Sequence, residues 1–134
     1  MSAESPAAAS AHPVTVMAFL YDDAAVMECT LTLDQIRGAL AEAKATKRRI
    51  WIDIESADRV AIAKALAGAM DLHPLSVDVI LTHDHRTSVD EFPGFAHIIM
   101  EIVHVDHVLL FEKVDVLLGA DWIVTVQDRP GDCF

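Results

Sequence analysis

Three strand-like segments follow one another in the last third of the chain, and this run restricts the folds available to it. Residues 95–105 and 108–118 are rich in branched and aromatic side chains, and Asp106 and His107 form a turn between them. Residues 122–127 add a third apolar segment after a second turn at residues 119–121. Strands this apolar need a covered face, so we expect helices from the earlier part of the chain to pack on their sheet.

The first half alternates strand and helix signals. Residues 14–21 and 26–31 are predicted to form a strand hairpin, and residues 49–54 a buried strand with Asp53 near its end. Thr32 and Gln35 fit a capping box at the start of a helix over residues 33–47. A second helix is expected from Ala57 to residue 73 and a short third helix over residues 74–81, with Pro74 at its first position. Residues 82–94 are polar and rich in turn formers. This order of elements predicts an α/β fold with a mixed sheet and helices on one or both faces.

The 134 residues are enough for one domain, which we place at residues 14–134. Residues 1–13 are interpreted as a disordered tail or a remnant of protein production. Hydrophobic residues make up 53% and charged residues 23%, so composition predicts a folded chain. Cys29 and Cys133 form no C-x-x-C pair, which argues against a disulfide framework or a thiolate zinc site and fits a reducing, cytosolic setting.

The charge balance excludes one large class of partner. The formal net charge is −11, and phosphate backbones require a basic face, so we expect no binding of nucleic acid. Residues 66–134 carry twelve acidic side chains and only Arg86, Lys113 and Arg129 as bases. Such a surface attracts cations or a basic partner, or it serves only to keep the domain soluble. No segment approaches the ~20 apolar residues of a membrane span.

Two groups of histidines are candidates for metal binding. Thr82, His83 and His85 resemble the T-H-x-H motif of the metallo-β-lactamase-like zinc hydrolases, although Arg86 stands where that family has a ligand. A small zinc hydrolase using His83 and His85 is therefore kept as an alternative function.

The second histidine group is His97, His104, Asp106 and His107. Because successive side chains of a strand alternate, His97 and His104 should face opposite sides of the sheet. We expect no shared metal site here, and histidines that lie at the surface or are partly buried. No G-x-S-x-G or glycine-rich phosphate loop occurs, so the chain is predicted not to be an enzyme.

Several short motifs in a fixed order carry a family resemblance. They are Trp51-Ile52-Asp53-Ile54, Leu72-His73-Pro74-Leu75 running into Asp78-Val79-Ile80-Leu81, the segment 83–86, Val89-Asp90-Glu91-Phe92 before a strand, and Gly131-Asp132-Cys133-Phe134. Together with Glu112-Lys113-Val114 and the hairpin into Trp122–Gln127, they cover about residues 14–134 and resemble the N-terminal cytoplasmic domain of the CorA family of divalent-cation transporters.

The resemblance implies a mixed central sheet sandwiched between helical layers, and a regulatory and assembly domain on the cytoplasmic side of the inner membrane. It implies association with other copies of the chain, as a pentamer in full-length members, and with a membrane region that forms the pore outside this chain. The ion would be Mg²⁺, with Co²⁺ or Zn²⁺ as other cargo of the family, and no organic cofactor is implied. A stand-alone interaction module that has lost transport is a further alternative.

Asp78 is the one metal-ligand candidate that the resemblance supplies. CorA members typically have two adjacent acids in the helix after His-Pro-Leu, and these help to bind regulatory Mg²⁺ between neighbouring subunits. Here Asp78 occupies the first position and Val79 the second. A carboxylate oxygen suits Mg²⁺, so Asp78 is predicted to contribute to a weak regulatory site whose other ligands lie outside this chain.

Overall fold

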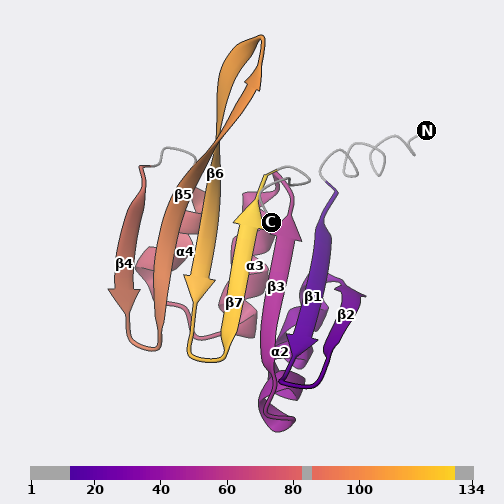
Figure 1. The fold of residues 1–134 in the computed structure, drawn as a ribbon. Helices are drawn as coiled ribbons and strands as arrows, with labels where there is room; N and C mark the ends of the chain where they lie inside the picture. The colour runs from indigo at the N-terminus through magenta and orange to yellow at the C-terminus, as the bar shows by residue number, and fades with distance from the viewer. Residues whose placement is uncertain (1–12, 83–85, 129–134) are drawn as a thin grey trace, which may run out of the picture.

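The computed structural model describes residues 13–82 and 86–128, and it contains one seven-stranded sheet with helices packed against it (Figure 1). The strands are β1 (Thr15–Tyr21), β2 (Val26–Leu31), β3 (Arg49–Glu55), β4 (Ser88–Phe92), β5 (Phe95–Asp106), β6 (Val108–Leu118) and β7 (Trp122–Gln127). The helices are the 3-10 turn η1 (Leu33–Gln35), α2 (Ile36–Ala45), α3 (Arg59–Ala69) and α4 (Pro74–Leu81).

The sheet is mixed, as the sequence predicts. Its strand order is β2-β1-β3-β7-β6-β5-β4, with β3 and β7 parallel and every other neighbouring pair antiparallel. After β3, the chain crosses through α3 and α4 to the far edge and returns strand by strand until β7 lies beside β3. The buried strand of the first half and the last strand of the meander therefore meet at the centre of the sheet.

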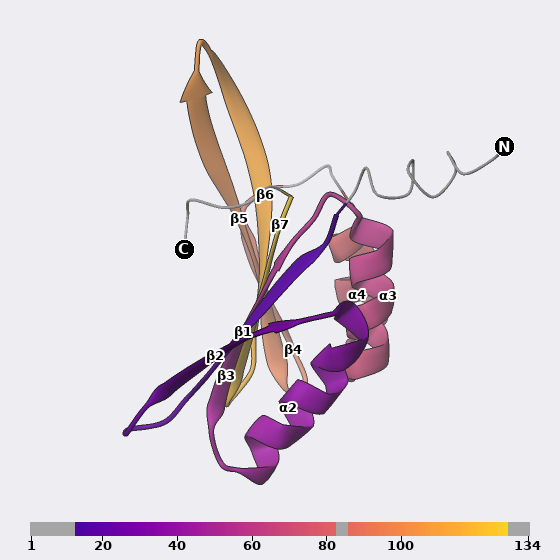
Figure 2. The same cartoon turned by 90° about the vertical axis from the view of Figure 1, so that its right-hand side faces the viewer.

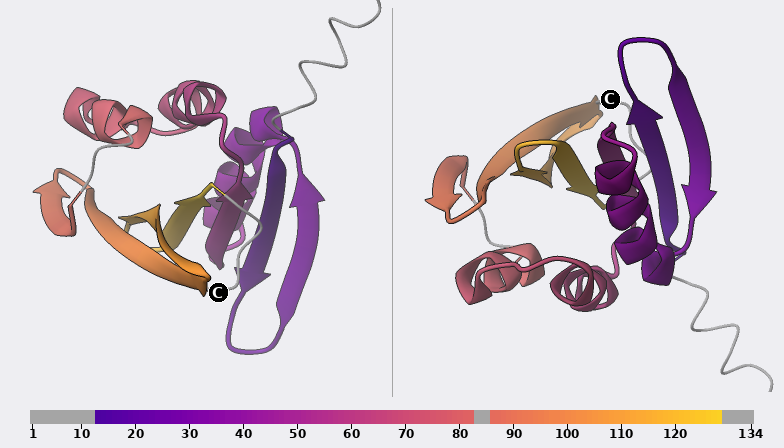
Figure 3. Two further views of the ribbon diagram at one scale, coloured as in Figure 1. Left: turned by 90° about the horizontal axis from the view of Figure 1, so that it is seen from above. Right: turned by 90° about the horizontal axis from the view of Figure 1, so that it is seen from below.

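The helices lie on one face of the sheet. Figure 2 shows α2, α3 and α4 together on the same side, and the views along the strands in Figure 3 agree. The mixed α/β sheet is confirmed. The second helical layer that the resemblance implies is not found among residues 13–82 and 86–128, whose helices leave the other face of the sheet uncovered.

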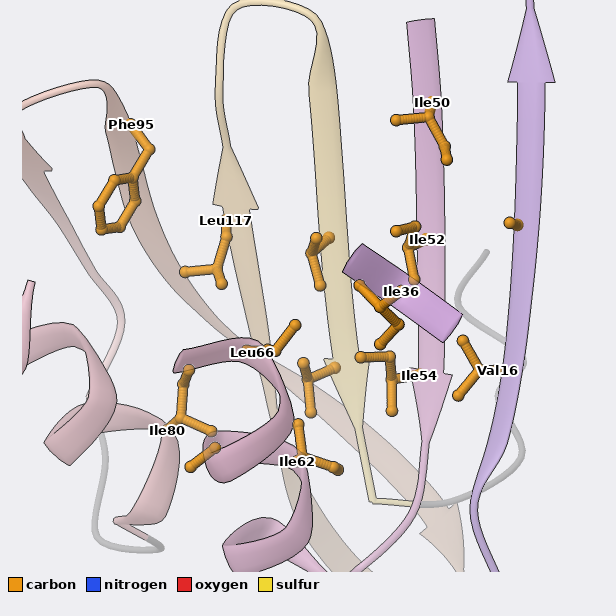
Figure 4. Packing of buried hydrophobic residues seen from close by; sticks show 14 of the residues in the cluster. Val16, Ile36, Ile50, Ile52, Ile54, Ile62, Leu66, Ile80, Phe95 and Leu117 are labelled. Carbon is orange, nitrogen blue, oxygen red and sulfur yellow. The ribbon is translucent and has the colours of Figure 1, made fainter. Parts of the chain in front are cut away.

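The core forms where β3 and the helices meet. Ile50, Ile52 and Ile54 alternate along β3 and point toward the helices, where they are almost completely buried (Figure 4). Ile62 and Leu66, four residues apart on α3, lie in the same cluster. Burial of apolar area at about 25 cal/mol per Å² makes this layer the main source of folding free energy.

Local sequence signals explain most element boundaries. The side chain of Gln35 accepts a hydrogen bond from the Thr32 backbone N–H at 2.8 Å, as the capping box predicts. Asp58 caps α3 by accepting from the Ala61 N–H at 3.1 Å, so this helix begins at Arg59, two residues later than expected. Pro74 is the first residue of α4, as predicted.

The expectation of a turn-rich segment over residues 82–94 was incomplete, because it contains β4. Ser88–Phe92 pairs antiparallel with β5 at the sheet edge. Val89, Asp90 and Glu91 are exposed there, and the two acids conceal the strand in the sequence. Charged residues on an edge strand discourage pairing with other chains.

Within the described ranges, no helix has the length and apolar character needed to cross a membrane. The longest of them, α3, has 11 residues.

The substitution Ile52→Ala tests the β3 core. Ile52 is fully buried, so we expect the free energy of unfolding to fall by about 2–5 kcal/mol through lost burial and the cavity left behind. Urea unfolding followed by circular dichroism measures this loss. Val60→Ala is the control, because Val60 on α3 is 70% exposed and its truncation should change stability by less than about 0.5 kcal/mol. Equal losses in both variants would contradict the assignment of the core.

Candidate functional site

Helix α4 carries Asp78 on its solvent side and packs against the sheet with its other side. Ser76 and Ile80 are buried, whereas Asp78 is exposed. At the start of the helix, the His73 ring nitrogen Nδ1 accepts a hydrogen bond from the Leu75 N–H at 3.1 Å. At its end, the Thr82 hydroxyl donates to the Asp78 carbonyl at 2.9 Å. The carboxylate of Asp78 is thus presented to solvent by a short helix fixed at both ends.

Beneath α4 lies a buried ionic network centred on Asp115 of β6. Its Oδ1 accepts a hydrogen bond from Arg59 Nη1 at 2.6 Å, and its Oδ2 lies 2.7 Å from His97 Nε2. The ammonium of Lys113 is 3.3 Å from the same Oδ2. All four side chains are at most 3% exposed, so these charges are compensated by one another and not by water.

Arg59 joins α3 to several other parts of the fold. Besides Asp115, its guanidinium donates to Asp128 Oδ1 at 2.9 Å and to the Lys113 carbonyl at 3.2 Å. Asp128 follows β7, so this one side chain connects α3 with two adjacent strands. The planar guanidinium, with five N–H donors in a fixed fork, suits such a multiply bonded position.

Lys113 holds the end of α4. Its ammonium donates to the carbonyl oxygens of Val79 and Thr82, the latter at 2.9 Å. The Val79 carbonyl, in the last turn of the helix, also accepts from the Thr82 N–H at 3.2 Å. The Thr82 carbonyl lies just after the helix end, where carbonyls lack intrahelical donors. The position of the Asp78 segment is therefore tied to a charged group of the sheet.

His97 completes the attachment of α4 to the sheet. The Ser76 hydroxyl lies 2.7 Å from Nδ1, and Asp115 lies on the Nε2 side. The carboxylate requires a proton on Nε2, so in the neutral ring Nδ1 accepts the hydrogen bond that the hydroxyl donates. Ser76, His97 and Asp115 form a chain of hydrogen bonds from helix to strand.

Burial and charge act in opposite directions on the pKa values of the network. Burial alone raises the pKa of Asp115, but the His97 hydrogen bond and the charges of Arg59 and Lys113 outweigh it and hold that pKa below its usual value. For Lys113, burial lowers the pKa, and the attraction of Asp115 restores only part of the decrease. Asp115 is thus ionised at neutral pH.

The order Ser76–His97–Asp115 resembles a hydrolase triad in its contacts but not in its accessibility. The three side chains are no more than 1% exposed, so no substrate can reach the hydroxyl. Asp115 also shares its charge with Arg59 and Lys113, whereas a triad carboxylate serves its histidine. The arrangement fits a structural attachment.

The opposite orientation of His97 and His104 is confirmed. His97 faces the helices, whereas His104 Nε2 lies 2.7 Å from Glu112 Oε1 on the other side of the hairpin. The expectation of surface or partly buried histidines was wrong for His97, because Ser76 and Asp115 supply the partners that let it be buried. His107 is exposed in the turn after β5, as expected.

The other predicted site residues do not converge in the described structure. His83, His85 and Cys133 lie outside the described residues, and Cys29 is a half-buried free thiol on β2. Among residues 13–82 and 86–128, no group of three or more histidine, cysteine or acidic side chains is arranged to hold a metal ion. Within this part of the chain, Asp78 is therefore a single donor.

The network was not anticipated from the sequence. Glu112, Lys113 and Asp115 are charged residues within an otherwise apolar strand segment, and that contrast was the available signal. Charged side chains are almost never fully buried without partners, so alternating opposite charges in such a strand indicate a buried network.

Comparison with solved structures identifies the fold. The chain superimposes on the full-length CmaX protein with a TM-score of 0.64 at 10% identity, covering 89% of this chain and 36% of that one. It superimposes on the soluble domain of CorA from Methanocaldococcus jannaschii with a TM-score of 0.54 at 14% identity, covering 88% of this chain and 41% of that one. No protein-family model and no curated protein matches the sequence. The resemblance to the CorA soluble domain is thus confirmed at the level of the fold, and the chain spans less than half the length of either structure.

The substitution Asp115→Asn tests the network. Removal of the carboxylate leaves Arg59 and Lys113 without their shared buried counter-charge, so we expect a loss of about 3–5 kcal/mol in unfolding free energy at pH 7. Since the folded pKa of Asp115 is lowered, its contribution exists above its unfolded pKa of about 4 and is lost as pH falls through the folded value. The wild type should therefore lose stability more steeply than the variant below about pH 4.

Denaturant titrations between acidic and neutral pH measure both effects. Asp22→Asn is the matched control, because Asp22 pairs with Arg48 at 3.5 Å on the surface. The Asn side-chain oxygen can still accept from the Ala24 and Ala25 N–H groups, so stability at pH 7 should be nearly unchanged. A variant as stable as the wild type at pH 7 would contradict the central role of Asp115.

Proposed function

We propose that this chain is the regulatory and assembly domain of a CorA-like divalent-cation transporter, acting on the cytoplasmic side of the membrane. The observation that carries the proposal is the fold, which is shared over 88% of the chain with the soluble domain of CorA. The pore would belong to a membrane region outside residues 1–134. In this function the domain binds ions and other copies of itself and catalyses no reaction.

The regulatory ion would be bound at Asp78. Mg²⁺ prefers hard oxygen donors in octahedral geometry, and Asp78 offers an exposed carboxylate while its neighbour Val79 offers none. One carboxylate and several waters make a weak site, so a second subunit has to supply further oxygen atoms. The same oxygen chemistry ranks Mg²⁺ before Co²⁺ and Zn²⁺, which more readily accept nitrogen ligands.

The network beneath α4 would couple binding of this ion to the rest of the domain. Lys113 binds the carbonyl oxygens of Val79 and Thr82, and both residues follow Asp78 within one helical turn. An ion that draws Asp78 toward a neighbouring subunit would therefore shift α4 and change its hydrogen bonds to Lys113 of β6. Arg59 and Asp115 extend these contacts to α3 and β7.

The substitution Asp78→Asn tests the ion site. We expect the wild type to bind Mg²⁺ weakly, with a dissociation constant on the order of 1 mM, and the variant to lose most of this binding because the charged oxygen is gone. Isothermal calorimetry combined with sedimentation, with and without Mg²⁺, measures binding and association together. Glu42→Gln is the matched control, because Glu42 is an exposed acid on a different helix.

Two results would contradict the ion-binding part of the proposal. One is an unchanged Mg²⁺ response in Asp78→Asn, and the other is no response of the wild type to Mg²⁺, Co²⁺ or Zn²⁺. A full equivalent of zinc retained after purification, and lost in a His83→Ala variant, would instead support the zinc hydrolase.

The β5–β6 hairpin offers a surface for assembly. Its outer half extends beyond the neighbouring strands (Figure 1), and in its register Val103 lies opposite Phe111 and Val105 opposite Leu109. These four side chains share one face and are 49–78% exposed. An exposed apolar patch of this kind is typical of a protein interface, and a second copy of the domain is the proposed occupant.

The substitution Phe111→Glu tests this surface. Phe111 is 60% exposed in the isolated chain, so the variant should fold normally but lose self-association, because burying the new charge is unfavourable. Sedimentation over a range of protein concentrations gives the association constant, for which we expect a decrease of about tenfold or more. Val60→Glu, at another exposed apolar position on α3, should associate like the wild type. Equal association of all three proteins would overturn the assignment.

A further inference from the structure

A cleft of about 890 Å³ lies at the end of the sheet opposite the projecting hairpin. The C-terminal end of α2, the β4–β5 turn and the β6–β7 turn gather at this end (Figure 1), and the residues after α3 close another side. The volume falls within the range of small-molecule sites in proteins. The cleft shares no residue with α4 or with the Asp115 network.

The charge of this cleft is opposite to that of the molecule. Five of the ten lysine and arginine residues in the chain line it, namely Arg37, Lys44, Lys47, Arg48 and Arg49, together with two acids, Asp71 and Asp121. In a chain of net charge −11, this concentrates positive potential in one concave place. Among the described residues, Arg48 is the only one of the five with an ion-pair partner, Asp22. The other four cations are available to a ligand.

Helix stability explains only part of this arrangement. Cations near a helix C-terminus interact favourably with its dipole, which would account for Lys44 and, just past the helix end, for Lys47 and Arg48. Arg37, however, is the second residue of α2, where the dipole disfavours a cation, and Arg49 belongs to β3. Arg37 and Lys44 are seven residues apart, two helical turns, so they lie on the same side of α2 toward the cleft.

Lys47 occupies a strained backbone position at the rim. Its φ is 56°, the left-handed region in which glycine is usual. The Lys47 N–H donates to the Lys44 carbonyl and the Arg48 N–H to the Ala43 carbonyl, which is the Schellman motif that normally carries glycine at this position. A lysine in place of glycine costs stability here, and such costs concentrate at functional positions.

An aromatic surface lies at the inner side of the cleft. Trp122 is half-buried, and its ring centroid is 6.2 Å from that of Phe95. Gly119 makes room for the indole, because a Cβ at that position would lie 2.2 Å from Trp122 Cε2. The cleft is therefore lined by exposed cations and by the aromatic side chains of Phe95 and Trp122.

We propose that this cleft binds a small phosphorylated molecule with a flat ring, a nucleotide in its chemical class. The phosphates would be bound by Arg37, Lys44 and Lys47, because charge-assisted contacts to phosphate are the strongest that these side chains make. The ring would lie against Trp122, where stacking on an aromatic side chain is favourable. Asp121, which also lines the cleft, would accept hydrogen bonds from sugar hydroxyls. This site is separate from the ion site at Asp78, so either can fail alone.

The fluorescence of Trp122 reports directly on the site. The chain has two tryptophans, and the Trp51 ring stacks on Phe19 of β1, so Trp51→Phe leaves Trp122 as the sole reporter. We titrate this protein at low salt with ADP, pyrophosphate and adenosine. The expected result is saturable quenching by ADP, with weaker binding of both fragments. Absence of saturation with ADP would overturn the proposal, and pyrophosphate binding as tightly as ADP would overturn the role of the ring.

Two charge substitutions locate the phosphates. Arg37→Gln should weaken ADP binding about tenfold, as expected for the loss of one charge-assisted contact. Lys64→Gln is the matched control on α3, outside the cleft, and should bind as the wild type does. Equal ADP affinity in the two variants would assign the binding to general electrostatics and overturn the site.

Lys47→Gly separates stability from binding. Glycine relieves the left-handed backbone, so the melting temperature should rise by about 2–4 °C while ADP affinity falls about tenfold. A raised melting temperature with unchanged ADP affinity would show that the Lys47 side chain does not bind the ligand and would overturn its role in the cleft. Calorimetric melting and the same fluorescence titration provide both readouts.

Discussion

The carboxylate of Asp115 is the group on which the arrangement of helices and sheet depends. It lies on β6 and compensates the charges of Arg59 from α3 and Lys113 from its own strand, and it bonds the His97 ring that binds Ser76 of α4. Apolar packing on β3 provides most of the folding free energy but little directionality. The ionic network fixes how α3 and α4 are oriented on the sheet, because each of its groups has a distinct partner at a fixed distance. Buried charges of this kind are better evidence of a specified geometry than of added stability.

The fold was predictable because its signals are local. Alternation along β3, the capping residues before the helices and Pro74 at the start of α4 each depend on a few neighbouring residues, and they place most elements within two residues of their observed ends. The edge strand β4 was not predicted, because an edge strand can expose polar residues on both sides. The resemblance to the CorA soluble domain predicted helices on both faces, whereas the described helices cover one.

The candidate site was predictable only in part, because its chemistry depends on contacts between distant residues. Asp78 was named from the motif after His73 and Pro74, and the structure places it exposed on α4, while its role as a metal ligand stays a prediction. The contacts that attach α4 to the sheet could not be predicted from the sequence, since His97 and Lys113 lie about 20 to 35 residues further along the chain. Alternation along β5 predicted which face His97 takes. It did not predict that Ser76 would be there to allow complete burial.

The distribution of charge separates the domain into two ends with different chemistry. Acidic side chains dominate the chain, and Asp78 belongs to that excess, which attracts cations. The cleft beneath α2 concentrates half of the basic residues in one concavity beside Trp122. If the excess acid served solubility alone, the few bases would be expected to spread among the acids and to pair with them. Their concentration in a single cleft, with one lysine held in a strained backbone conformation, indicates that an anion is the missing partner of that end of the domain.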